Sequence, residues 1–211
     1  MRVGKIIDFN KFRKILCKVK ANGKLVVFVL VFSAGFLAGV LGFKDISFSK
    51  KLFDFLAEYF CKARENEAFL TVAVNSFLNL LLLLVITFSS GTSMLGLVFI
   101  PISVFSTGFM FGIFGAGLYS AFAYKGVAFF AVLVVPWAVI SVISVILSAI
   151  EAFDFSLLLT RVIGLKEKCE DISAYFKDYC IKHGLLCIFI ALAAIIDGML
   201  SYNFFENFNL F

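Results

Sequence analysis

Charged side chains are scarce in this sequence: Asp, Glu, Lys and Arg make up only 16% of its 211 residues, whereas 62% are hydrophobic. Soluble domains are about 45–50% apolar, and a single domain of 23.4 kDa has too little interior to bury the excess. The composition therefore excludes a water-soluble monomer and requires that many apolar side chains face lipid. Proline is also rare, with two residues, and no low-complexity tract is present, so disordered and collagen-like chains are excluded as well.

Residues that carry chemistry are equally few. The single histidine, His183, belongs to no Cys/His or Glu/His cluster that matches a known metal-binding motif, and neither a G-x-x-x-x-G-K-[ST] nor a G-x-G-x-x-G loop occurs. An intramembrane serine protease would need a serine paired with a histidine at membrane depth, and the segment Gly91 to Gly96 is one residue out from G-x-S-x-G. We therefore expect a protein that is not an enzyme and that holds no cofactor and no metal.

Long apolar runs dominate what is present. A helix that crosses the membrane needs about 20 predominantly apolar residues, and such a helix bonds its own backbone, as lipid requires. Alternation typical of barrel strands is absent. The sequence therefore predicts an all-α integral membrane protein, a bundle of about five transmembrane helices with interfacial amphipathic helices. The predicted spans cover residues 25–43, 69–88, 94–124, 126–150 and 185–204.

The distribution of Lys and Arg predicts the orientation, because cytoplasmic loops carry the excess of these residues. An inside N-terminus places thirteen of them in the cytoplasm and six outside, so we expect an N-in, C-out protein. The net charge of +5 is then explained by the orientation in the membrane and by contact with anionic lipid headgroups, and it does not indicate nucleic-acid binding. The segments outside the spans are a basic cytoplasmic amphipathic leader (1–24), an outer amphipathic loop (44–68), a cytoplasmic amphipathic loop (151–184) and an outer tail (205–211).

Amphipathic helical spacing occurs in two of these segments. Residues 50–63 repeat apolar side chains at i, i+3 and i+4 opposite charges, which predicts a helix on the outer membrane interface. Residues 166–183 show a similar pattern and are expected to rest on the inner leaflet. Such helices either frame the bundle or serve as docking surfaces. The candidate contact residues for a partner are Leu52, Phe53, Phe55, Leu56, Tyr59 and Phe60.

Asn75, Asn79 and Asp197 are the candidate functional polar groups at membrane depth, where each is costly without a partner. Asn75 and Asn79 are four residues apart and share one helix face, so they either bond to a neighbouring helix or line a cavity. Asp197, in the outer half of the last span, pairs with an asparagine, is protonated, or reaches the interface. These three residues also carry an alternative function, a small transporter or permease component.

Glycine pairs and one proline predict how the helices pack. Gly35 with Gly39, and Gly108 with Gly112, form two G-x-x-x-G patterns that allow backbones to approach closely. The contact lies either within one chain or between the subunits of a homo-oligomer. Pro136 removes a backbone hydrogen bond from the fourth span and is expected to kink it.

The order of these features resembles that of the stage II sporulation protein M family. The resemblance covers about residues 25–160. It rests on the glycine-rich first span (Ser33 to Gly39), the charged outer segment, Asn75 near the start of the second span, the Gly108 and Gly112 pair, and Pro136 in the fourth span. The chain differs from the family pattern where Thr107 precedes Gly108 and where Trp137 follows Pro136.

This resemblance implies a non-catalytic, multipass protein of the bacterial cell membrane that acts at the sporulation septum or engulfing membrane. It implies a scaffold that anchors and localises peptidoglycan-degrading partners during septal wall remodelling and engulfment in endospore formation. In this interpretation residues 44–68 form the outer contact surface.

Overall fold

A computed structural model describes the backbone of residues 9–43, 47–62, 64, 68–164 and 172–208, and side chains within 23–43, 49–60, 64, 68–164 and 172–205. Every element in these ranges is helical. Six α-helices follow in order, with short π-helical turns after α4 and α5: α1 (Phe9–Gly42), α2 (Ser47–Lys62), α3 (Phe69–Gly91), α4 (Gly96–Phe129), η1 (Phe130–Val134), α5 (Val135–Leu159), η2 (Thr160–Gly164) and α6 (Ile172–Phe208).

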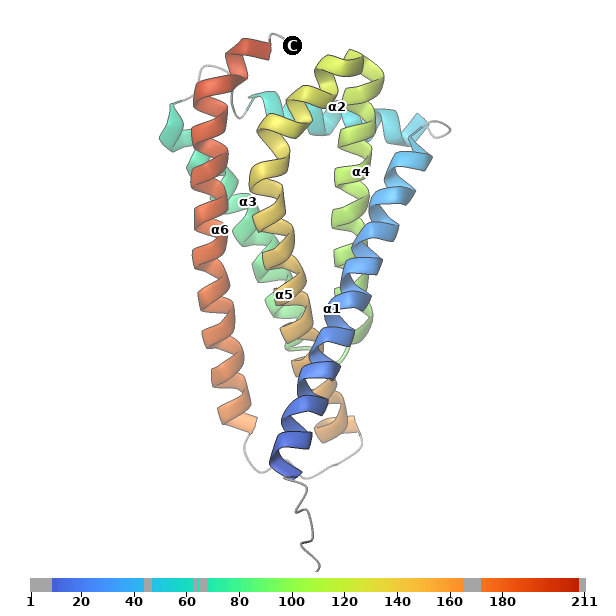
Figure 1. Cartoon of the computed structure of the whole chain (residues 1–211), viewed down its shortest axis with the longest axis vertical. Helices are drawn as coiled ribbons and strands as arrows, with labels where there is room; N and C mark the ends of the chain where they lie inside the picture. The colour runs from blue at the N-terminus through green and yellow to red at the C-terminus, as the bar shows by residue number, and fades with distance from the viewer. Residues whose placement is uncertain (1–8, 44–46, 63, 65–67, 165–171, 209–211) are drawn as a thin grey trace, which may run out of the picture.

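Five long helices run along the length of the molecule, and α2 lies across one end of them (Figure 1). Four continuous stretches are long and apolar enough to cross a membrane: Gly23–Gly42, Phe69–Gly91, Gly96–Gly164 and Ile172–Phe205. The third of these stretches contains both α4 and α5. Within α4 the chain reverses direction near Ala123, whose φ of 49° and ψ of −127° interrupt the helix (Figure 1). The predicted all-α membrane bundle is thus confirmed. The chain enters α1 at one end of the bundle and leaves α6 at the other (Figure 1).

Several helices extend beyond the predicted spans. The leader is continuous with the first span from Phe9, α5 continues to Leu159, and α6 begins at Ile172. The described part of the amphipathic segment 166–183, residues 172–183, forms the first turns of α6 and is continuous with the last predicted span. Within it Tyr179 is 3% exposed and stacks on Phe155 of α5 with ring centroids 4.8 Å apart, whereas Tyr175 is 57% exposed.

The four predicted glycines meet where α1 crosses α4. A Cβ atom at any of them would collide with a backbone carbonyl oxygen of the facing helix. The colliding oxygens belong to Phe105 for Gly35, Phe109 for Gly39, Phe32 for Gly108 and Phe36 for Gly112. The two small faces are therefore reciprocal, and they lie within one chain rather than between copies.

Pro136 lies at a change of helix type. It is the second residue of α5 and lies two positions after the last residue of the π-helical turn η1. Helical backbone continues from η1 into α5, so this proline lies within a continuous helix and has no N–H to bond to the preceding turn. The expected kink thus coincides with a π-helical turn, in which one extra residue is accommodated.

Aromatic and aliphatic side chains fill two core clusters at opposite ends of the bundle, and a third, smaller cluster of Leu84, Leu186 and Ile190 joins α3 to α6. The cluster under α2 contains Phe53, Phe114 and Phe129, and the cluster at the opposite end contains Ile100 and Tyr179. In the first cluster the ring of Phe53 occupies the space that a side chain at Gly117 would take. The α2 helix is thus seated on α4 by its own apolar face.

Replacing Gly112 with alanine is expected to lower the free energy of unfolding by about 1–3 kcal/mol, because the added methyl overpacks the α1–α4 contact. The matched control is Gly184→Ala on α6, where a Cβ meets nothing within 4 Å. This control should be neutral or stabilising by up to about 1 kcal/mol, since alanine favours helix over glycine. Unfolding midpoints in detergent measure both. Equal stability of the two variants would contradict the close crossing.

Candidate functional site

A polar cavity of about 190 Å³ lies between the end of α2, α3, α5 and α6. It gathers all three polar residues that were predicted inside the spans: Asn75 and Asn79 from α3, and Asp197 from α6. The lining also includes Tyr59, Phe60, Arg64, Ser76, Leu80 and Trp137. The spacing of four between the asparagines places both on the same face of α3, as predicted from the helical period.

A buried ion pair forms the floor of this cavity. The Arg64 guanidinium donates through Nη2 to Asp197 Oδ2, with the two side chains 6% and 0% exposed. Arg64 Nε donates to Ser201 Oγ at 3.0 Å, and Nη1 donates to the Phe60 carbonyl oxygen at 3.0 Å. The structure thus gives Asp197 a partner, Arg64, that was not among the sequence-based options of an asparagine, protonation or the interface.

Further contacts satisfy the remaining polar atoms of the pair. Ser76 Oγ donates to Asp197 Oδ2, and Ser201 Oγ approaches Oδ1 at 3.3 Å. The Arg64 guanidinium carbon lies 3.4 Å from the Phe60 ring centroid, a cation–π contact. Buried charges are tolerated when paired and hydrogen-bonded in this way. The pair thereby fixes the end of α2 to both α3 and α6.

Sequence reasoning missed Arg64 because it was counted as an outer-loop charge. One signal was present: Asp197 is the single acid within the predicted spans, and it lies in the half of its span nearest the loop that contains Arg64. A buried carboxylate needs a cation or hydrogen bonds within reach. The nearest cations in that loop were therefore its natural candidates.

The α2 helix presents only part of its predicted contact face. Leu52, Phe53, Leu56 and Phe60 pack against the bundle, and Phe53 is only 8% exposed. Phe55 and Tyr59 are 63% and 50% exposed. Their rings stack with centroids 6.4 Å apart, and the Tyr59 hydroxyl donates to Asn79 Oδ1 at 2.9 Å. The surface open to a partner thus centres on these two residues.

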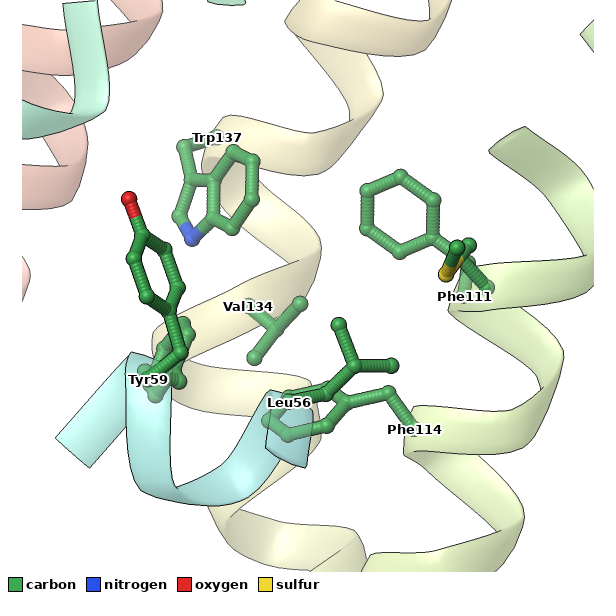
Figure 2. A pocket seen from close by; sticks show the side chains of 8 residues that line it. Leu56, Tyr59, Phe111, Phe114, Val134 and Trp137 are labelled. Atoms are coloured by element: carbon green, nitrogen blue, oxygen red, sulfur yellow. The ribbon is translucent and has the colours of Figure 1, made fainter. Parts of the chain in front are cut away.

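A second, apolar cavity of about 160 Å³ lies beneath α2. Its walls come from α2, α4, η1 and α5 (Figure 2). It shares Tyr59, Phe60 and Trp137 with the polar cavity. The Trp137 indole Nε1 is buried and has no hydrogen-bond partner among the residues that the structure describes. The remaining lining residues are Leu56, Met110, Phe111, Phe114 and Val134.

A serine and the single histidine meet near the other end of the bundle. Ser148 Oγ lies 3.0 Å from His183 Nε2, and His183 Nδ1 lies 3.1 Å from the Tyr179 carbonyl oxygen. A carbonyl only accepts, so Nδ1 carries a proton, and in the neutral ring Nε2 then accepts a hydrogen bond from the Ser148 hydroxyl. Sequence reasoning did not pair these residues, which lie 35 positions apart.

The serine–histidine pair is enclosed by the helices around it. Ser148 is 0% exposed and His183 is 4% exposed, and the rings of Phe88 and Tyr179 pack against the imidazole. As packed, the hydroxyl is out of reach of a substrate, and the hydrogen bond joins α5 to α6. Across the described ranges, no three His, Cys, Asp or Glu side chains converge as metal ligands would.

The bundle of apolar helices, closed at one end by an amphipathic helix, defines a multipass all-α membrane protein. The family model for stage II sporulation protein M matches residues 27–202, and the chain belongs to this family. The match extends from α1 to α6, well beyond the part of the chain on which the sequence resemblance was based. No curated protein and no solved structure matches the chain.

Removing one partner of the ion pair is expected to destabilise the bundle strongly. Asp197→Asn leaves the Arg64 charge buried without its counter-ion, which costs about 3–5 kcal/mol. The double variant Arg64→Met with Asp197→Leu removes both charges and should recover most of that loss. Thermal unfolding in detergent of the single and double variants measures the coupling. Losses that simply add in the double variant would contradict a buried pair.

Proposed function

We propose that this protein is a non-catalytic membrane scaffold that anchors and localises peptidoglycan-degrading partners during engulfment in endospore formation. Family membership supports a role in sporulation. The observation that carries the scaffold role is the placement of α2: it lies across one end of the bundle, fixed by Arg64, and exposes Phe55 and Tyr59. A rigid, partly exposed aromatic pair is the kind of anchor that protein interfaces use.

The orientation suits this role. With the N-terminus inside, as the Lys and Arg distribution favours, the α2 end of the bundle faces outward. Peptidoglycan and the enzymes that degrade it lie on that side of the cell membrane. The exposed charges Lys51, Asp54 and Glu58 surround the aromatic pair and form a polar rim, as is common around interface centres. By the same proposal the protein resides at the sporulation septum or the engulfing membrane.

The polar cavity favours a second candidate function, a small transporter or permease component. Asn75, Asn79 and Asp197 were the residues expected to serve such a role, and all three line one cavity. The oxygens of Asp197 are, however, engaged by Arg64, Ser76 and Ser201. A carboxylate held in this way is a structural anchor rather than a free relay group, which favours the scaffold.

A photo-crosslinking amino acid at Phe55 is expected to capture peptidoglycan-degrading proteins from the membranes of sporulating cells. The matched control is the same replacement at Phe99, which has similar exposure, 56% against 63%, and lies near the start of α4 at the opposite end of the bundle. Capture of these enzymes from both positions, or from Phe99 alone, would contradict both the contact face and the orientation.

Complementation of a deletion strain separates the scaffold from the other classes. In a deletion strain, the double variant Phe55→Ala with Tyr59→Ala is expected to support engulfment poorly. The single variant Tyr59→Phe, which keeps the ring, should support engulfment like the parent protein. Asn75→Ala, in the cavity wall, and Ser148→Ala, in the serine–histidine pair, should both support engulfment. Loss of engulfment with Asn75→Ala together with loss of solute flux in proteoliposomes would favour the transporter. Loss with Ser148→Ala at normal protein level would favour an enzyme.

A further inference from the structure

The apolar cavity beneath α2 contains an unsatisfied donor. The Trp137 Nε1–H is buried without an acceptor among the described residues. Leaving a buried donor unpaired destabilises a folded protein, because the group has lost its hydrogen bonds to water. In Figure 2 the indole nitrogen lies on the edge of the ring nearer Tyr59, at the junction with the polar cavity. An oxygen atom supplied from outside the chain would satisfy it there.

The chemistry of the walls limits what that oxygen belongs to. Leu56, Phe114 and Val134 make one side of the space apolar. On the other side, the charges of Arg64 and Asp197 neutralise each other and their polar atoms are engaged. The apolar cavity therefore offers one buried donor without a partner, the Trp137 Nε1–H, and no charged side chain in its lining. It suits an uncharged acceptor group attached to a hydrocarbon chain.

Size and position point to the same ligand. A dry cavity of about 150 Å³ lined by Leu, Ile and Phe holds a benzene molecule in another protein, so the 160 Å³ here accommodates a short hydrocarbon segment. Amphipathic helices such as α2 lie at the boundary between headgroups and acyl chains. The ester groups of glycerolipids lie at that boundary. Two lining residues, Tyr59 and Met110, are 50% and 41% exposed, so the cavity opens to the surface of the bundle.

We propose that this cavity binds a bilayer glycerolipid, with its ester carbonyl accepting a hydrogen bond from Trp137 Nε1 and the first part of its acyl chain among Leu56, Phe114 and Val134. This site shares Tyr59 with the exposed aromatic pair, but it does not depend on the scaffold role. Lipid binding would hold α2 against α4 and α5 from below, beside the ion pair that holds its end.

The single tryptophan of the chain is a built-in reporter. The full-length protein is reconstituted into phosphatidylcholine vesicles whose acyl chains are brominated next to the ester group, because bromine quenches indole fluorescence on contact. The parent protein is expected to be quenched strongly. Leu56→Phe, which adds volume inside the cavity, should lose most of the quenching. Leu82→Phe, the same replacement at a site on α3 that is 64% exposed, should be quenched like the parent.

Equal quenching of both variants would show that Trp137 contacts only the surrounding lipid, and it would overturn the proposal. An unquenched parent protein would also overturn it, because water would then fill the cavity. Should Leu56→Phe fail to reconstitute, Met110→Phe blocks the mouth of the cavity, with Met199→Phe, 54% exposed on α6, as its control.

The contact between Trp137 Nε1 and the lipid carbonyl is tested separately. Trp137→Phe keeps an aromatic ring but removes the hydrogen-bond donor. The variant protein should retain less phosphatidylcholine than the parent after detergent extraction, as measured by native mass spectrometry. Unchanged retention would overturn the carbonyl contact.

Discussion

The buried ion pair between Arg64 and Asp197 is the contact on which one end of this molecule depends. A charge inside an apolar bundle is stable only beside its counter-ion, so the connection after α2 is held at a fixed point on α6. That constraint places α2 across the bundle and turns its apolar face onto α4. The cavities beneath α2 and the exposed aromatic pair above it both follow from this placement.

The rest of the bundle is held by two different kinds of contact. The α1 helix packs mainly on α4, where glycines remove the side chains between two backbones and dispersion acts at short range. The α3, α5 and α6 helices are joined by polar contacts in addition to apolar packing, such as that of Leu84 against Leu186 and Ile190. The Tyr179 hydroxyl donates to the Phe88 carbonyl oxygen at 2.9 Å, and Ser148 bonds to His183. In lipid, where apolar surfaces gain little by meeting each other, both kinds are needed for a defined arrangement.

The parts of the fold that depend on local pattern were predictable, and those that depend on distant pairing were not. Apolar runs located the long apolar helices, and glycine spacing located the tight crossing of α1 and α4. Charged residues, in contrast, did not mark where the helices end. Lys182, predicted to lie in a loop, lies inside α6 and pairs with Glu151 of α5 at 2.8 Å. The partners of Asp197 and His183 lie 133 and 35 residues away, and no local rule joins them.

Tyr59 connects the two surfaces of α2 that the proposals use. Its ring lines both cavities, its hydroxyl is tied to Asn79, and half of the residue remains exposed next to Phe55. A molecule in the cavity and a protein on the outer face would therefore contact the same side chain from opposite sides. Any effect of one on the affinity for the other must be reciprocal. The ion pair fixes only the end of α2. How rigidly the side chains of Phe55 and Tyr59 are held on the outer face therefore depends on how the middle turns of α2 pack against the cavity.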